Sequence, residues 1–392
     1  MSRIISRKDF LKLGGVGFAG AVLSASTGCG RSRGKVVRFF TGIQETTALE
    51  RAAYDIVARF EEQHSNIDVQ REAMPTEDQR MVIQTRLQSE DPPDVFSYDT
   101  GPGFGGVLAD AGLLRPLEDP YKQNGWNIYG WAKQRVSYNG RVYGVPDQVE
   151  EIVVYYNKDL VPEVPKTVEE LRQIAAELKG RGIIPFAFGD REQWPAGHMF
   201  SIGVSNVLGR DGLNDILYGD GRWDTAEVVM VIDLMFRDFV QSGYYPKGVN
   251  AITYDAANTL FYSGKAAMNP TGTWIVQEIV QAVEGFEVGL FPFPSIADSA
   301  IAPPVGVGTG LFVAARAKNP EGAIEFIDYL QQDSTARLIA ERFNTIPAHP
   351  VNLEGLDVPD LFKQVLNDLS KSPQAESFGT TSTCWHRRTS TR

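Results

Sequence analysis

Cysteine and histidine are scarce in this chain, and both shortages narrow the chemistry that it can perform. Its 392 residues include only two cysteines, Cys29 and Cys384, so no framework of several disulfides can form. The four histidines are scattered without the spacing of a metal site, and no Gly-x-Ser-x-Gly sequence marks a serine hydrolase. The sequence therefore predicts neither a metal site nor a cofactor.

Positive charge and long apolar runs are also in short supply. The chain has 38 lysines and arginines against 49 aspartates and glutamates, a net charge of −11. The first 28 residues carry Arg3, Arg7, Lys8 and Lys12 against Asp9, so the remainder carries −14. Such a balance argues against nucleic acid or an anionic membrane surface as a partner. No later run approaches the ~20 apolar residues of a bilayer-spanning helix.

The first 29 residues have the order of an export signal, with charged residues, a weakly apolar run, small residues and a cysteine. The segment 6–12, Ser-Arg-Lys-Asp-Phe-Leu-Lys, resembles a twin-arginine signal with Lys8 in place of the second arginine. The segment 26–29, Ser-Thr-Gly-Cys, resembles a lipobox with Ser26 in place of the usual leucine. An ordinary secretory signal with an incidental cysteine is the alternative.

We therefore expect residues 1–28 to be a signal peptide, Cys29 to be lipidated and residues 29–34 to be a tether. The protein would then act outside the cytoplasm, at the cell surface or in the periplasm. Only its lipid would hold it to the outer face of the cytoplasmic membrane.

Strands and helices alternate at the start of the mature chain. Side-chain patterns predict strand, helix, strand, helix and strand in that order, at 35–40, 46–63, 67–73, 77–89 and 95–98. This order predicts an α/β fold with a mainly parallel sheet covered by helices. Ligands bind beyond the carboxyl ends of strands in such sheets, so the loops 41–45 and 98–103 are candidate site loops. About 360 mature residues exceed one ordinary core, which predicts two domains.

Strand and helix patterns continue to residue 343. Extended segments are predicted at 142–146, 152–156, 266–268, 286–291 and 311–315. Helices are predicted at 167–179, 228–242, 250–262, 321–332 and 334–343. The first of these helices begins with a capping box, in which Thr167 is the N-cap and Glu170 follows three residues later.

A series of motifs follows one order along the chain. They are Pro93-Asp94-Val95-Phe96, Gly112-Leu113-Leu114, Tyr143-Gly144-Val145-Pro146, Val154-Tyr155-Tyr156-Asn157-Lys158-Asp159-Leu160, Pro165-Lys166-Thr167-Val168-Glu169-Glu170-Leu171, Phe261-Tyr262-Ser263-Gly264-Lys265-Ala266-Ala267-Met268, Gly272-Thr273-Trp274, Asn319-Pro320-Glu321 and Ile346-Pro347-Ala348. In combination they resemble the bacterial extracellular solute-binding proteins of the sugar-binding class (family 1), over roughly residues 35–378.

The resemblance implies a two-lobed periplasmic-binding-protein fold of type II, whose chain crosses between the lobes more than once. We expect an N-lobe of residues 35–148 and 306–350. We expect a C-lobe of residues 149–305 and 351–379. Each lobe would be a mainly parallel sheet flanked by helices.

Two tryptophans and a glycine are candidate ligand contacts in the second lobe. Trp274 follows Gly272 at a strand end, where the resemblance implies a stacking platform for a sugar; a core tryptophan is the alternative. Trp194 lies in a predicted polar loop, where it could bind ligand; a core tryptophan is again the alternative.

Polar candidates gather after the predicted strands and at the crossover. Tyr98 and Asp99 end one strand, and Gln44 and Glu45 follow another, although helix capping competes for this last pair. In the crossover the candidates are Asp147, Gln148 and Glu150. The resemblance implies a sugar-binding carboxylate at Glu150, and we expect Glu151 to face solvent.

These residues predict the solute-binding component of an ABC importer. It would be a lipoprotein and a monomer that captures a di- or oligosaccharide between its lobes and delivers it to a membrane permease. A secreted glycoside hydrolase that uses Asp147 and Glu150 is one alternative. The same scaffold with another ligand, such as a polyol, is a second alternative.

The last 13 residues differ in composition from all that precedes them. Residues 380–392 are rich in threonine, serine and arginine, show no helical period and contain Cys384. A reading frame shifted near Gly379 would explain this tail. A polar tail without a role is the alternative.

Overall fold

The computed structural model describes residues 35–44, 46–296 and 304–371. The expected signal peptide, Cys29, the tether, Glu45 and the tail 380–392 lie outside these residues.

The first sheet is built from the N-terminal strands and two later ones. Its order is β2 (Ile67–Met74), β1 (Lys35–Gly42), β3 (Val95–Asp99), β12 (Thr309–Val313) and β6 (Gly144–Pro146). The strand β1 runs parallel to β2 and β3, whereas β12 runs antiparallel to β3 and β6. The parallel strands β1, β2 and β3 therefore end at the same edge of the sheet.

Helices cover this sheet. The longer ones are α1 (Thr47–Gln63), α2 (Thr76–Gln88), α12 (Pro320–Gln331) and α13 (Asp333–Phe343). Shorter elements complete this half: η2 (Pro102–Gly106), α3 (Val107–Asp110), α4 (Glu118–Asn124), α5 (Gly130–Gln134), β4 (Ser137–Tyr138) and β5 (Arg141–Val142). The helix α1 begins where the hydroxyl of Thr46 accepts a hydrogen bond from the Leu49 amide, and it buries an apolar stripe that ends at Phe60.

The second sheet has the order β10 (Val288–Phe291), β7 (Gln148–Asn157), β9 (Ala266–Gly272) and β8 (Ile184–Phe186). Only β8 and β9 run parallel. Its helical elements are α6 (Val168–Gly180), α7 (Trp194–Tyr218), α8 (Ala226–Ile232), η3 (Asp233–Asp238), α9 (Phe239–Gln241), η4 (Val249–Ala251), α10 (Tyr254–Tyr262), η5 (Thr273–Ile275), α11 (Val276–Ala282) and α14 (Asp360–Lys371).

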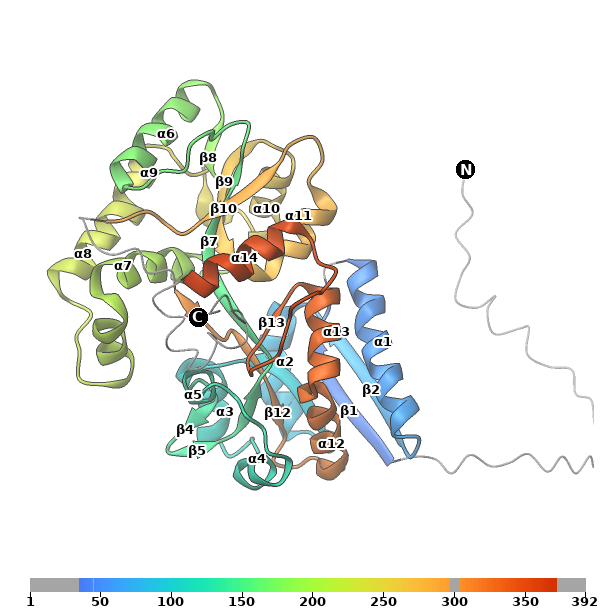
Figure 1. The fold of residues 1–392 in the computed structure, drawn as a ribbon. Coiled ribbons are helices and arrows are strands. Elements are labelled where there is room, and N and C mark those ends of the chain that lie inside the picture. The colour runs from blue at the N-terminus through green and yellow to red at the C-terminus, as the bar shows by residue number, and fades with distance from the viewer. Residues whose placement is uncertain (1–34, 45, 297–303, 372–392) are drawn as a thin grey trace, which may run out of the picture.

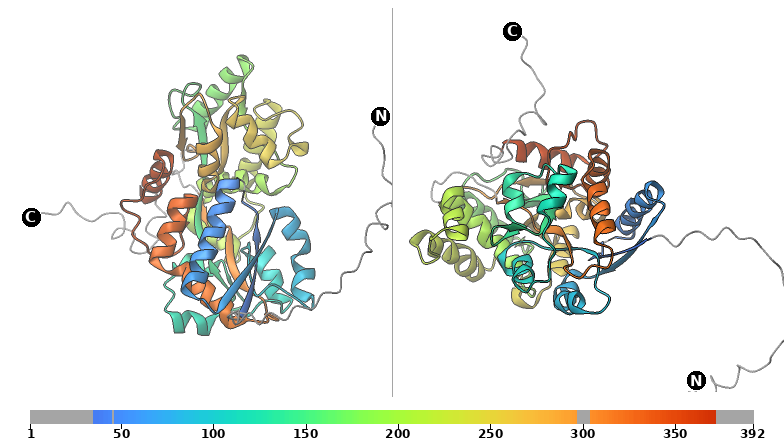
Figure 2. Two further views of the ribbon diagram at one scale, coloured as in Figure 1. Left: turned by 90° about the vertical axis from the view of Figure 1, so that its right-hand side faces the viewer. Right: turned by 90° about the horizontal axis from the view of Figure 1, so that it is seen from below.

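The strand β7 joins the two halves of the molecule. It starts directly after β6 of the first sheet and continues into the second sheet, as Figure 1 shows. At its start it pairs with two short strands, β13 (Ile346–Pro347) and β11 (Val305–Gly306). Figure 2 shows the two halves from other sides, with the blue N-terminal strands in one and the yellow-to-orange helices α10 and α11 in the other.

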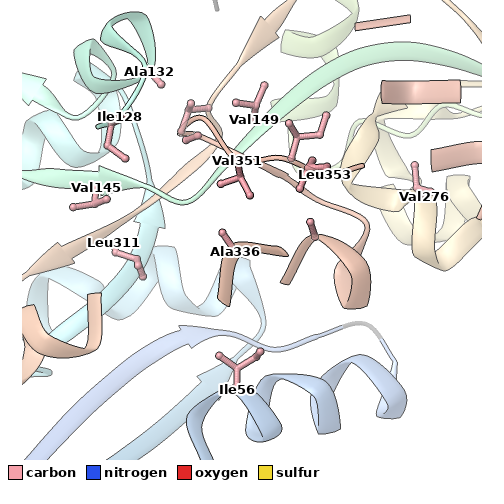
Figure 3. Packing of buried hydrophobic residues seen from close by; sticks show 14 of the residues in the cluster. Ile56, Ile128, Ala132, Val145, Val149, Val276, Leu311, Ala336, Val351 and Leu353 are labelled. Carbon is pink, nitrogen blue, oxygen red and sulfur yellow. The ribbon is translucent and has the colours of Figure 1, made fainter. Parts of the chain in front are cut away.

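A continuous apolar core passes through this junction. Val149 of β7 packs in the same cluster as Val351 and Leu353, which precede α14. Figure 3 shows these three residues between Val145 of the first half and Val276 of the second. The segment around residues 351–353 therefore fills the space between the two sheets at the point where the chain crosses.

The sequence patterns place most of these elements correctly. The expected α/β fold is observed, but both sheets are mixed rather than mainly parallel, because the strands near the crossover run antiparallel to their neighbours. The hydroxyl of Thr167 caps α6 as expected, while the Glu170 carboxylate accepts from the amide of Lys166 rather than from that of Thr167. The helix predicted at 250–262 becomes η4 and α10, separated by the N-cap Thr253.

Within the described residues, no helix combines the length and the apolar character that a membrane crossing requires.

Asp94 ties three elements of the first half together. Its side chain is fully buried, and its two oxygens accept hydrogen bonds from the amides of Arg38 and Asn319, each at 2.8 Å. We expect Asp94→Ala to lower the free energy of unfolding by about 2–4 kcal/mol, because two buried amides lose their acceptor. Chemical denaturation measures this change.

A nearby exposed aspartate provides the control. Asp91 pairs with Lys318 at the surface, so Asp91→Ala is expected to change stability by less than about 1 kcal/mol. Equal effects of the two substitutions would contradict the role of Asp94.

Candidate functional site

A cluster of charged side chains lies where the parallel strands of the first sheet end. Arg80 of α2 donates from Nε and Nη2 to the two oxygens of Asp99, at 2.8 and 2.7 Å, and from Nη1 to Glu77 at 2.6 Å. The guanidinium lies 5.5 Å from the ring centre of Phe104. We call Glu77, Arg80 and Asp99 the polar cluster.

The position of the polar cluster follows from the topology. Asp99 ends β3, and α2 begins two residues after the end of β2, so both reach the same sheet edge. Glu77 and Arg80 are three residues apart on α2 and therefore lie on one face of the helix. The bidentate bond to Asp99 raises the pKa of Arg80, which remains a fixed cation.

Aromatic side chains gather in the second half of the molecule. The ring centres of Trp194 and Tyr254 lie 4.5 Å apart, and the ring of His198 lies 5.0 Å from each of Trp194 and Trp274. The indole N–H of Trp274 donates to the Tyr254 hydroxyl at 2.8 Å. We call Trp194, His198, Tyr254 and Trp274 the aromatic cluster.

The aromatic cluster is assembled by the starts of two helices and the end of a strand. Trp194 and His198 are four residues apart on the first turns of α7, so their rings share a face. Tyr254 begins α10, and Trp274 follows β9. A Cβ at Gly272 would come within 1.6 Å of the Trp274 ring, so this glycine leaves the room that the indole occupies.

One hydrogen bond joins the two clusters. The indole N–H of Trp194 donates to Oε1 of Glu77 at 3.1 Å, although the two residues are 117 positions apart in the chain. Burial, together with the charge of Arg80, lowers the pKa of His198 to about 4, so its imidazole is neutral at physiological pH. The polar and aromatic clusters therefore face each other across the junction.

Carboxyl groups of the crossover lie beside these clusters. The Asp147 oxygens accept from the Thr309 hydroxyl at 2.8 and 2.9 Å, and Glu150 accepts from the side-chain amide of Gln148 at 2.6 Å. Burial raises the pKa of Asp147 to about 6. Burial, together with the negative charges of Asp147 and Asp99, raises that of Glu150 to about 7. Glu150 can therefore act as donor or acceptor near neutral pH.

The structure corrects the expectation that Glu151 faces solvent. Its side chain is only 2 % exposed, and its Oε2 has no hydrogen-bond partner among the described residues. The reason is that β7 is the crossing strand, so elements pack against both of its faces. Burial and the charge of Asp368 in α14 raise the pKa of Glu151 to about 8.

The other predicted site residues occupy varied positions. Tyr98 is buried, with its ring packed near those of Phe96 and Phe104. Gln44 is half-buried, and its backbone N–H donates to the Glu50 carboxylate at the start of α1. Asp99, Trp194 and Trp274 meet in the two clusters, with Glu150 beside them. Glu45 lies outside the described residues. Their roles in binding stay predictions.

Sequence reasoning missed Glu77, Arg80, His198 and Tyr254. The helix α2 follows a strand whose end lies at the candidate edge, a signal that could have pointed to Glu77 and Arg80. The Trp194–His198 spacing becomes informative only once a helix is placed at residue 194, where the sequence pattern predicts a loop.

No group of three or more histidine, cysteine, aspartate or glutamate side chains in the described part of the chain is arranged to hold a metal ion.

Comparison with protein families gives one match, and it covers most of the chain. The model of the family described as bacterial extracellular solute-binding protein matches residues 45–336. The chain is 30% identical over 243 residues to an uncharacterised ABC transporter extracellular-binding protein of Pyrococcus horikoshii, covering 58% of this chain and 54% of that protein. It is 27% identical over 230 residues to the maltodextrin-binding protein of Bacillus subtilis, covering 55% and 52%. The chain thus spans about half the length of these relatives.

Solved structures resemble most of this chain. A chitin oligosaccharide binding protein superimposes with a TM-score of 0.75 at 20% identity, covering 87% of each chain. The maltose/maltodextrin-binding domain of Bdellovibrio bacteriovorus, bound to maltotriose, gives a TM-score of 0.69 at 21% identity, covering 87% and 90%. These likenesses confirm the expected periplasmic-binding-protein fold.

The buried carboxyl of Glu151 predicts a pH-dependent stability. Because its pKa is raised from 4.5 to about 8 in the folded state, the folded protein binds the proton more tightly than the unfolded chain does. Stability therefore falls as the pH rises from about 4.5 to about 8. We expect Glu151→Gln to raise the melting temperature at pH 8 and to change it little at pH 5.

Glu163→Gln is the matched control, because Glu163 is exposed and loses the same charge. Thermal unfolding of both variants at the two pH values tests the effect. If Glu151→Gln raises the melting temperature equally at pH 5 and pH 8, the result would contradict a buried glutamate that is protonated in the folded protein.

Proposed function

The chain belongs to the family of bacterial extracellular solute-binding proteins, and we propose that it captures an oligosaccharide and delivers it to an ABC importer. This is a family of binding proteins rather than enzymes, so the glycoside hydrolase alternative is set aside. The proposed class of ligand is supported by the relative from Bacillus subtilis, which is named for maltodextrin, and by the maltotriose in the Bdellovibrio structure.

The observation that carries this proposal is the juxtaposition of the polar and aromatic clusters. A sugar presents hydroxyl groups at its edges and apolar C–H groups on its ring faces. Arg80, Glu77 and Asp99 offer fixed donors and acceptors to the hydroxyls, and Trp194 and Trp274 offer flat apolar surfaces to the ring. Each aromatic contact would contribute ~0.5–1.5 kcal/mol, if aromatic pairs are a guide.

The hydrogen bond between Trp194 and Glu77 is one that a bound ligand could replace. A sugar hydroxyl can accept from an indole N–H and donate to a carboxylate, so a saccharide between the clusters would satisfy both groups in place of their direct bond. Hydroxyl matching would then set specificity, because a buried polar group left without a partner costs ~1–3 kcal/mol.

We propose that the two halves are lobes that open and close about the start of β7. The proposed lobes are residues 35–148 with 306–350 and residues 149–305 with 351–379. A ligand that contacts both lobes favours the closed form by its greater affinity for that form. The closed protein, a monomer, would then dock on the permease. The lipid on Cys29 would keep it at the outer face of the cytoplasmic membrane.

Substitution of the platform tryptophan tests this site. We expect Trp274→Ala to weaken saccharide binding by about tenfold or more, because the flat indole face on which the sugar ring would stack is lost. Isothermal titration calorimetry with maltotriose, chitotriose, xylotriose and galactobiose, and with the polyol sorbitol, measures the affinities.

Trp223→Ala is the matched control, since Trp223 is 46% exposed in the same half of the protein and lies outside both clusters. Circular dichroism checks that each variant is folded. Affinity that survives Trp274→Ala in a folded protein would place the ligand elsewhere, and binding of sorbitol alone would favour a polyol receptor.

A further inference from the structure

A small cavity lies beside the aromatic cluster, inside the half of the protein built on the second sheet. Two of the residues that line it, His198 and Tyr254, belong to the aromatic cluster. Three buried polar residues also line it: Asn258, Asn269 and Thr271. The cavity is therefore adjacent to the surface on which the proposed sugar would stack.

The polar side chains of the wall are organised by hydrogen bonds. The side-chain amide of Asn269 donates to Oδ1 of Asn258 at 2.9 Å, and the hydroxyls of Tyr254 and Thr271 lie 2.8 Å apart. Trp274 donates to the same Tyr254 hydroxyl, so the wall is connected to the stacking platform. Asn258, Asn269 and Thr271 are each only 2 % exposed, and their network fixes the shape of the wall.

The imidazole ring of His198 is a polar group that lines this cavity and can still form hydrogen bonds. No hydrogen bond from the described residues reaches its ring nitrogens. The burial that lowers its pKa keeps the imidazole neutral, so one nitrogen can donate and the other can accept. A hydroxyl group, which also donates and accepts, is a suitable partner for such a ring.

The remainder of the wall is apolar and narrow. Ala187, Phe188, Pro195 and Ala257 line it. The cavity holds about one water-sized group, and it is only partly enclosed. A ligand group that fits must therefore be short, with an apolar stem and one polar tip.

We propose that this cavity receives the exocyclic hydroxymethyl group of a hexose unit bound against the aromatic cluster. The inference rests on the proposed function and adds a selection within it, for hexose-built over pentose-built saccharides. The methylene would lie against the alanine and proline side chains, and the hydroxyl would reach His198 or the amides of the wall.

Matched sugars that differ by this one group test the inference on the unaltered protein. The pairs are D-glucose with D-xylose, D-galactose with L-arabinose, and cellotriose with xylotriose. We expect the hexose member of at least one pair to bind about tenfold more tightly by calorimetry, because a buried methylene and a hydrogen bond are lost in the pentose.

A cavity-filling variant tests the location. We expect Ala257→Leu to reduce affinity for the hexose member toward that for the pentose member and to leave the pentose affinity unchanged. Ala256→Leu is the control, because Ala256 is exposed on the same helix and lies outside the cavity lining. If Ala257→Leu does not fold, the comparison of sugar pairs on the unaltered protein still decides.

The outcomes separate the two levels of the proposal. Equal affinity within every pair, from a protein that binds saccharides, overturns the hydroxymethyl site. A preference that Ala257→Leu leaves intact overturns the location. Binding to no saccharide at all overturns the proposed function itself.

Discussion

The hydrogen bonding of β7 at its start is the constraint on which the rest of the structure depends. This single strand leaves β6, pairs with β13 and β11 at the junction, and then runs through the middle of the second sheet. Because both halves share it, the backbone hydrogen bonds at its start and the apolar contacts of Val149, Val351 and Leu353 determine how the two clusters face each other in this conformation. The same crowding buries Glu151 and half-buries Asp147 and Glu150, and it raises the pKa values of all three.

The two halves contribute different chemistry to one place. The first sheet supplies charges, because its parallel strands end at an edge where Asp99 meets Arg80 and Glu77. The second supplies rings, because two helices begin and a strand ends beside one another. A ligand that uses both the charged side chains of the first half and the tryptophan rings of the second must therefore contact both halves. This division explains why binding and closure would be one event.

Much of this arrangement could be predicted from the sequence, because it depends on local patterns. The strands and helices around the first site loops follow from side-chain period. The candidate Asp99 follows from its place at a strand end and Trp194 from its polar loop, whereas the roles predicted for Trp274 and Glu150 are implied by the family resemblance. What escaped prediction depends on tertiary packing. The burial of Glu151 requires knowing that elements cover both faces of β7. To predict the contacts of His198 with two tryptophans, one must know where α7 begins. To predict why residue 272 is a glycine, one must know that the Trp274 indole packs against it.

The most direct test of the account is a crystal structure of the protein with a bound saccharide identified by calorimetry. The account predicts a sugar ring stacked on Trp274 or Trp194, with its hydroxyls within hydrogen-bond distance of Arg80, Glu77 or Asp99, so that one ligand contacts both clusters. A saccharide held by residues of only one sheet, with the Trp194–Glu77 bond intact, would contradict it.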